Sequence, residues 1–140
     1  MKILFLCKGN VGRSQIAEEL FKKKFGNAHE VFSAGLQISG PEQPIGELQP
    51  AIKEVLEVLN EEGIDASKNI RKQVTEKMIF NVDMVIVIIE DEVVLPEYIS
   101  QSGKCIRWNI PDPKGMDLEN TRKVKNLIQE SVKGIDFLLN

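Results

Sequence analysis

The sequence of 140 residues predicts an α/β fold that is built on a parallel β-sheet. Short apolar runs, typical of buried strands, alternate along the chain with segments whose apolar residues recur at helical spacing. Such alternation favours right-handed crossovers between parallel strands. The length suits one domain around one core, so we expect residues 1–140 to form a single domain.

The first half of the chain is expected to contain two strands and the first helix. Residues 2–6 form an apolar run typical of a buried strand. From Ser14 the apolar residues recur at helical spacing, until Gly26 provides a stop signal. Residues 31–34 predict a second strand, and residues 37–49, with their glycines and prolines, predict a loop.

The second half is expected to contain two more helices, a short helical turn at residues 75–79 and two more strands. Residues 52–59 share one helical face, and Gly63 ends that helix. Residues 83–89, a run rich in β-branched side chains, predict a third strand, and Cys105–Trp108 predicts a fourth. A last helix is expected at about residues 118–138. Its inward-facing residues are expected to be Val124, Leu127, Ile128, Val132, Ile135 and Leu138.

Composition limits the classes of function. The formal net charge is -3 and the isoelectric point about 5.3, a balance that gives no global attraction to nucleic acid or to anionic membranes. The most apolar stretch, residues 82–89, is far shorter than a membrane span and contains Asp83. No signal-peptide core follows Met1. We therefore expect a cytoplasmic protein, with a monomer favoured, that binds neither nucleic acid nor membrane.

The few cysteines and histidines restrict the chemistry further. Cys7 and Cys105 are the two cysteines, and His29 is the single histidine. This set supplies neither a disulfide framework nor a four-ligand zinc site, and with a single histidine far from Cys7 in sequence we expect no triad with a histidine base. We expect no metal and no cofactor. Cys105 begins a predicted strand and is interpreted as a core residue.

The segment Cys-Lys-Gly-Asn-Val-Gly-Arg-Ser at residues 7–14 lies between the first strand and the first helix. A tight turn at this place presents backbone N–H groups and a helix N-terminus to an anion. Active sites of parallel sheets lie beyond the carboxyl ends of the strands, where Cys7 is placed. The residues expected to bind a phosphate group are Lys8, Gly9, Asn10, Val11, Gly12, Arg13 and Ser14.

Each residue type in this loop suits a reaction in which Cys7 is the nucleophile. Asn10 tolerates left-handed backbone and can brace the loop. Arg13 can bind two phosphate oxygens as a fork, and its charge and the loop dipoles favour a thiolate. Ser14 can donate a hydrogen bond to the sulfur, or can simply cap the helix. The spacing matches neither the GxxxxGK[ST] phosphate loop nor a dinucleotide fingerprint.

These residues make the chain resemble the low-molecular-weight protein tyrosine phosphatases and the related thioredoxin-coupled arsenate reductases. The family loop is a cysteine, five residues, an arginine and then serine or threonine, which matches residues 7–14. The resemblance extends over essentially the whole chain. Further similar segments are Ser33-Ala34-Gly35, Gly63-Ile64-Asp65, residues 83–87 and Asp112-Pro113.

The resemblance implies a four-stranded parallel sheet in the strand order 2-1-3-4, flanked by helices, with the phosphate loop after strand 1. It also implies a two-step hydrolysis of a phosphorylated protein or a small phosphomonoester. Cys7 attacks phosphorus, Arg13 holds the oxygens, and Asp112 acts first as general acid and then as general base. From its own sequence context, Asp112 between two prolines is also an ordinary turn residue.

Three departures from the family pattern bear on the activity. Gly12 stands where many members carry a second cysteine, and residues 87–98 lack the cysteines of a reductase relay. Lys114 follows the Asp-Pro pair, where phosphotyrosine enzymes usually carry aromatic residues. Two alternatives stay open, an arsenate reductase that uses an external thiol and a cysteine phosphocarrier. Carriers of that kind lack an arginine in the loop and an acidic residue late in the chain, whereas this chain has Arg13 and Asp112 in those places.

Some reductase relatives hold a monovalent cation beneath the loop. The residues of matching type here are Asn10, Glu18, Ser33 and Asp65. Each also has a structural explanation, as loop brace, exposed helix residue, strand end and turn cap respectively, and we expect these explanations to apply.

Overall fold

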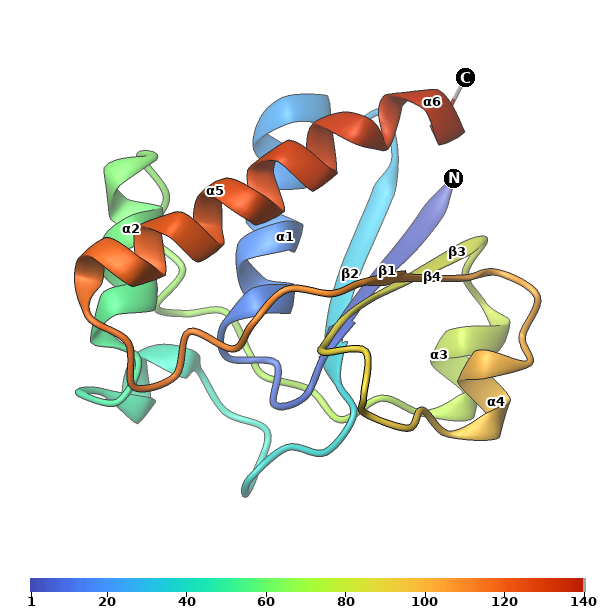
Figure 1. Cartoon of the computed structure of the whole chain (residues 1–140), viewed down its shortest axis with the longest axis horizontal. Helices are drawn as coiled ribbons and strands as arrows, with labels where there is room; N and C mark the ends of the chain where they lie inside the picture. The colour runs from blue at the N-terminus through green and yellow to red at the C-terminus, as the bar shows by residue number, and fades with distance from the viewer. Residues whose placement is uncertain (140) are drawn as a thin grey trace.

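A computed structural model describes residues 1–139 of the chain, and its four parallel strands form one sheet in the order β2-β1-β3-β4 (Figure 1). The strands are β1 (Lys2–Cys7), β2 (Glu30–Gly35), β3 (Met84–Ile88) and β4 (Cys105–Trp108). The predicted fold class and strand order are therefore confirmed. The two central strands, β1 and β3, carry the long apolar runs because both of their faces are covered.

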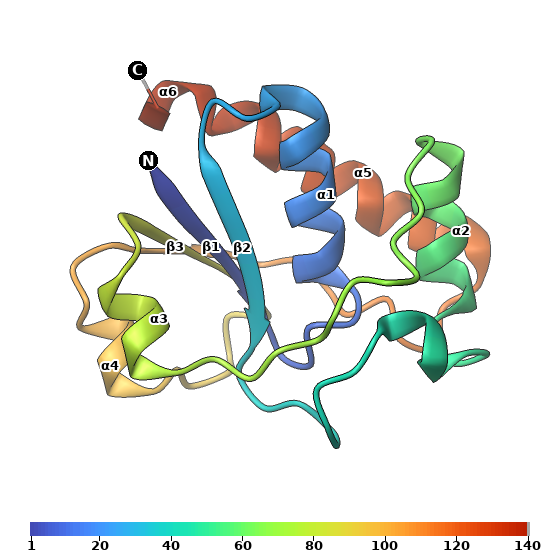
Figure 2. The same ribbon diagram turned by 180° about the vertical axis from the view of Figure 1, so that it is seen from behind.

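The helices lie on both faces of the sheet (Figures 1 and 2). One face is covered by α1 (Arg13–Phe25), α2 (Lys53–Glu61) and α5 (Leu118–Gly134). The other is covered by the short helices α3 (Glu76–Phe80) and α4 (Glu97–Ser100). The remaining short elements are η1 (Ile45–Leu48) and α6 (Asp136–Leu139). Among residues 1–139, no helix is long and apolar enough to cross a membrane.

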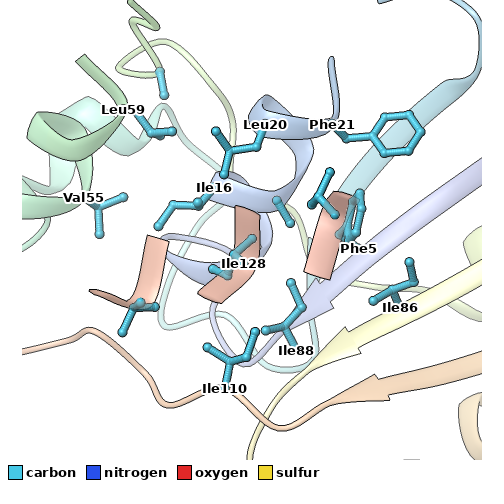
Figure 3. Close-up of a cluster of buried hydrophobic side chains, with 14 of the residues drawn as sticks. Phe5, Ile16, Leu20, Phe21, Val55, Leu59, Ile86, Ile88, Ile110 and Ile128 are labelled. Carbon is cyan, nitrogen blue, oxygen red and sulfur yellow. The ribbon is translucent and has the colours of Figure 1, made fainter. Parts of the chain in front are cut away.

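Alternating residues of the strands build two cores. Phe5, Ile86 and Ile88 point to the side of α1, α2 and α5 (Figure 3). Leu4 and Val85, one residue out of phase, pack on the side of α3 and α4. This two-sided burial holds the sheet rigid, and the loops at the carboxyl ends of its strands are anchored on that frame.

Two parts of the predicted last helix are wrong. The helix ends at Gly134, and α6 begins at Asp136, so the expected single helix is two. Leu127 and Leu138 were expected to face the core, but they are 50% and 48% exposed. The inward stripe runs instead through Val124, Ile128, Val132 and Ile135. Leu127 has the right residue type but lies on the flank of that stripe, where no neighbouring element covers it.

Two further expectations need correction. The predicted loop at residues 37–49 contains η1, and α4 has no counterpart among the predicted elements. Glu18 was interpreted as an exposed helix residue, but it is buried, with its carboxylate 2.6 Å from the ammonium of Lys22. The long lysine reaches back over one turn of α1 and pairs with the carboxylate, which allows a charged group in that place.

Candidate active site

The carboxyl ends of the four strands bring the predicted residues to one edge of the sheet. Cys7 ends β1 and Gly35 ends β2, and these two residues are paired in the parallel register. Glu90 follows β3, and Asp112 follows β4. The location that the sequence predicts for Cys7, at the edge where α/β proteins bind ligands, is therefore the one found.

The thiol of Cys7 is buried and contacts the hydroxyl of Ser14. The Sγ–Oγ distance is 3.0 Å, and the Ser14 oxygen also accepts a hydrogen bond of 2.7 Å from the Asn10 amide. When Cys7 is a thiolate, the Ser14 hydroxyl must be the donor in the contact with sulfur. Ser14 lies inside α1, whose N-cap is Gly12, so the N-cap interpretation of Ser14 is wrong.

Asn10 is the brace of the loop. It is fully buried and is the non-glycine residue with positive φ, at 56°, in the described part of the chain. Its amide nitrogen donates to Ser14 and to Ser33 (3.0 Å), and its amide oxygen accepts the backbone N–H of Lys72 at 2.9 Å. Asparagine suits this position because it tolerates left-handed backbone and has both a donor and an acceptor.

The backbone N–H groups of residues 8–14 donate no hydrogen bond to any of the described residues. They belong to a turn that runs into the N-terminus of α1, which is a typical arrangement for binding an anion. The carbonyl groups of Cys7 and Lys8 instead accept from Leu36 and Gln37, at 2.8 and 2.9 Å. These bonds fix the loop to the segment after β2 and leave its donors available.

The other loop residues differ in their surroundings. Lys8 is exposed, and Val11 is half-buried against the main core. Gly12 is buried against Pro113, whose Cγ would lie 3.4 Å from a Cβ at this position. A Cβ at Gly9 would meet the side chain of Val11 at 3.9 Å, which is an ordinary contact. The contact between Gly12 and Pro113 joins the loop after β1 to the loop after β4.

Arg13 extends from the first turn of α1 and is only 2% exposed. Its Nη1 group donates to the carboxylate of Glu90 and, at 2.9 Å, to the carbonyl of Ile110. Its Nη2 group lies 3.7 Å from a carboxylate oxygen of Asp112. A buried guanidinium needs such partners, because an unpaired charge in this place would be costly.

Asp112 lies in the loop after β4, beside Arg13. One carboxylate oxygen accepts the backbone N–H of Lys114 at 2.9 Å, and the other faces Arg13. The side chain is 43% exposed and is therefore open to solvent. Lys114 itself is exposed and makes its contact through its backbone.

Sequence reasoning missed Glu90, which contacts the guanidinium of Arg13. The rule that parallel strands end at one edge nominates the acidic run Glu90-Asp91-Glu92 after β3, because that edge also holds Cys7. It does not tell which of the three faces Arg13. Asp91 and Glu92 are exposed, and only Glu90 is turned inward.

Cys105 is too far from Cys7 to form a disulfide. Cys105 on β4 is paired with Val85 on β3, and Val85 is paired with Leu4 on β1. Leu4 lies three residues before Cys7, so the two cysteines are separated by two strand spacings and by three residues along the strand. At the usual spacings of a sheet, this places the two Cα atoms roughly 14 Å apart. A disulfide needs less than about 7 Å. Burial raises the pKa of the Cys105 thiol, opposed in part by Arg107, and this keeps the thiol protonated.

The cation-site residues that the family resemblance suggested are engaged with other groups. Ser33 and Asn10 bond to each other, and Glu18 pairs with Lys22. Asp65 accepts from the backbone and hydroxyl of Ser67, which lowers the pKa of its carboxyl. Within residues 1–139, no group of three or more His, Cys, Asp or Glu side chains is placed to hold a metal ion.

Comparison with known proteins agrees with this geometry. An arsenate reductase of Staphylococcus epidermidis is 27% identical over 131 residues, which is 94% of this chain and 92% of the relative. The solved structure of a low molecular weight protein tyrosine phosphatase from T. tengcongensis has a TM-score of 0.77 and 28% identity, with 96% of this chain and 97% of that chain covered.

A second similar structure is an arginine phosphatase from Geobacillus stearothermophilus. It has a TM-score of 0.80 and 25% identity, with 99% of this chain and 92% of that chain covered. The family model described as low molecular weight phosphotyrosine protein phosphatase matches residues 2–138. The chain therefore belongs to the low molecular weight phosphotyrosine protein phosphatase family.

Proposed function

We propose that this protein is a phosphomonoesterase that acts through a cysteinyl-phosphate on Cys7, with phosphotyrosine in a protein as the specific substrate. The observation that carries the proposal is the loop at residues 8–14, whose backbone N–H groups are unengaged next to a buried cysteine and a buried arginine. Such a cradle suits a phosphoryl group, whose negative charge is spread over three equatorial oxygens.

The proposed first step transfers the phosphoryl group to sulfur. The Cys7 thiolate attacks phosphorus, the S–P bond forms, and the bond from phosphorus to the leaving oxygen breaks. Asp112 gives its proton to that oxygen. The loop amides and Arg13 hold the three equatorial oxygens. The hydroxyl of Ser14, 3.0 Å from sulfur, stabilises the thiolate before the attack and as it is released again.

The proposed second step returns the enzyme to its starting state. Asp112, now a carboxylate, takes a proton from water, and the oxygen attacks phosphorus. The S–P bond breaks, and inorganic phosphate and the Cys7 thiolate are released. Apart from the substrate and the attacking water, every group in this scheme is supplied by the protein. We also propose that the chain works as a single domain and a monomer in the cytoplasm.

The second candidate is an arsenate reductase, which the name of the S. epidermidis relative favours. A reductase of this kind needs thiols that pass electrons away from Cys7. Cys105 cannot reach Cys7 in this fold, and the other residues near the site carry no thiol. The activity would therefore depend on an external thiol. A phosphocarrier is disfavoured because Asp112 beside Arg13 supplies the acid that turnover requires.

The deciding assay is hydrolysis of an aryl phosphate by the wild type, Cys7→Ser and Asp112→Asn. Cys105→Ser and Glu92→Gln are the matched controls for the two substitutions. We expect turnover by the wild type and both controls, none by Cys7→Ser, and a drop of about 10²–10⁴-fold in Asp112→Asn. Absence of turnover by the wild type between pH 5 and 7 would refute the phosphatase proposal.

Three further assays distinguish a tyrosine phosphatase from an arginine phosphatase and from an arsenate reductase. Peptides with phosphotyrosine and with phosphoarginine compare the two substrates that the names of similar proteins suggest, and we expect faster turnover of phosphotyrosine. Arsenate reduction with glutathione is measured in the wild type and in Cys105→Ser. Efficient reduction in both, together with weak phosphatase activity, would establish the reductase instead.

A further inference from the structure

Glu90 contacts the guanidinium of Arg13 from the loop after β3. We propose that Glu90 is a positioning residue, which holds Arg13 so that its remaining N–H groups face the phosphate loop. This inference rests on the proposed function, since it assigns a role within the same site. It concerns the binding of the phosphate group itself, which can be measured without turnover.

The hydrogen bonds of Arg13 indicate which edge of the guanidinium is free. Nη1 carries two hydrogens, and it has two acceptors, the carboxylate of Glu90 and the carbonyl of Ile110 at 2.9 Å. Both hydrogens of Nη1 are therefore used. A bidentate fork to an oxyanion needs two parallel N–H groups, and the edge formed by Nε and Nη2 still offers them.

Asp112 cannot substitute for Glu90 in this role. Its nearer oxygen is 3.7 Å from Nη2, beyond hydrogen-bond distance, and its other oxygen is already engaged with the backbone of Lys114. Asp112 also lies on the Nη2 side, toward the edge that an anion would use. Without Glu90, Nη1 would keep only the carbonyl of Ile110, and Arg13 would shift toward Asp112, so that its fork would be directed at a carboxylate rather than at phosphate.

The loop that carries Glu90 is itself fixed. Arg107, on β4, donates from Nη2 to the carbonyl groups of Glu90 and Val93. The N–H of Ile89 donates to the carbonyl of Trp108 at 3.0 Å, and the N–H of Val93 donates to that of Glu90 at 3.1 Å. The backbone of Glu90 is therefore held on both sides, so that its side chain has a defined origin from which to reach Arg13.

A competing role for Glu90 would be to occupy the anion site until substrate arrives. A carboxylate in that role would accept from the Nε and Nη2 edge, as a phosphate would. Glu90 accepts from Nη1 instead, where it shares the group with Ile110. It therefore leaves the fork open, and its removal is expected to weaken phosphate binding.

The test compares Glu90→Gln and Glu90→Asp, with Glu92→Gln as control. Glutamine keeps the length and an acceptor oxygen without the charge, whereas aspartate keeps the charge but is one methylene too short to reach. If Glu90 acts by position, Glu90→Gln stays within about threefold of wild type and Glu90→Asp loses about tenfold or more in phosphate affinity. The exposed Glu92 makes no contact with Arg13, so Glu92→Gln should match wild type.

The dissociation constant of inorganic phosphate is measured by calorimetry, and kcat and KM are measured for an aryl phosphate. The melting temperature identifies any variant that is merely unstable. The reverse order, with Glu90→Asp near wild type and Glu90→Gln impaired, would overturn the proposal, as would tighter phosphate binding in both. If the wild type binds phosphate but hydrolyses no substrate, the proposed function is refuted. The phosphate affinities of the Glu90 variants would still test the role of Glu90.

Discussion

At the scale of single residues, the site consists of groups that restrict one another's orientation. The amide of Asn10 donates to the oxygen of Ser14, and the same oxygen contacts the sulfur of Cys7. The bond from Asn10 therefore orients the Ser14 hydroxyl toward Cys7. The chain has no histidine in this site, and His29 lies after the first helix. A thiolate on Cys7 must therefore be stabilised by the loop amides, Arg13 and this hydroxyl.

Removal of the Ser14 hydroxyl should slow the reactions of Cys7. Ser14→Ala deletes a hydrogen bond to a charged group, which is worth about 1.5–3 kcal/mol, so a loss of roughly tenfold or more in rate is expected. The measurement is alkylation by iodoacetamide at pH 7, in a Cys105→Ser background where Cys7 is the only thiol. Ser131→Ala, which removes a hydroxyl of α5 that bonds to the carbonyl of Leu127, is the control. An unchanged alkylation rate in Ser14→Ala would contradict the assigned contact.

The role proposed for Asp112 predicts a dependence on the leaving group. A proton donor matters most when the departing oxygen is strongly basic, so Asp112→Asn should impair alkyl phosphates far more than activated aryl phosphates. The check is a series of substrates with leaving groups of increasing pKa, with kcat measured for the wild type and the variant. Parallel slopes in the two proteins would show that Asp112 is not the proton donor.

At the scale of elements, the phosphate loop depends on how closely β2 approaches it. Gly35 ends β2, and a Cβ at this position would lie 3.0 Å from both the Gly9 carbonyl carbon and the Lys8 oxygen. It would also lie 2.9 Å from the side chain of Ile38. Glycine is therefore required here for close packing and not for an unusual backbone angle.

Gly35→Ala should displace the loop. We expect a loss of about 1–3 kcal/mol in the free energy of unfolding, because the added methyl group is overpacked against backbone. A drop of tenfold or more in kcat/KM should accompany it, since a shift of 1 Å in a binding loop can cost about 10²-fold. Gly134→Ala in α5 is the matched control.

The control position meets nothing within 4 Å, so Gly134→Ala should leave activity intact and add up to about 1 kcal/mol of stability. Urea denaturation and steady-state kinetics measure both quantities. Wild-type kinetics in Gly35→Ala would show that the loop does not depend on this contact.

At the scale of the whole molecule, three helices on one face of the sheet meet at Glu62. Its two carboxylate oxygens each lie 2.8 Å from a lysine nitrogen, one from Lys23 of α1 and one from Lys125 of α5. Glu62 itself follows α2. Hydrogen bonds from Lys125 and Lys23 lower the pKa of this carboxyl from 4.5 to about 2.

This pair of contacts predicts a stability that depends on pH. Because the pKa of Glu62 is lowered in the folded state, its contribution is complete above about pH 4.5 and is lost as the pH falls toward 2. Glu62→Gln should therefore reduce the free energy of unfolding by about 1 kcal/mol at pH 7, a figure that allows for screening of this partly exposed group. The difference from wild type should disappear at low pH.

Urea denaturation at pH 7, 4 and 2.5 measures this difference. Glu130→Gln, which removes an exposed contact with Lys133 on the same helix, is the control and should have little effect at any pH. A difference between wild type and Glu62→Gln that grows as the pH falls would refute the assigned ion pairs.

The sequence by itself predicted the alternation of strands and helices and nominated Cys7 as the reactive group. The apolar runs of β1 and β3 and the periodic faces of the helices predict the α/β alternation, because burial selects these patterns directly. The loop at residues 7–14 indicates a phosphate site, because its glycines, Asn10 and Arg13 have few other uses at that spacing. The strand order and Asp112 came from the resemblance to a family.

Only the tertiary structure decided which distant residues meet. The pairing of Arg13 with Glu90, the close approach of Gly35 and the outward position of Leu127 all depend on how elements far apart in sequence are packed. Each of these residues follows an ordinary local pattern, so nothing in the local sequence distinguishes it. The phosphate loop with its cysteine is encoded over eight residues, whereas the geometry of the site depends on all four strands, whose carboxyl ends meet at one edge of the sheet.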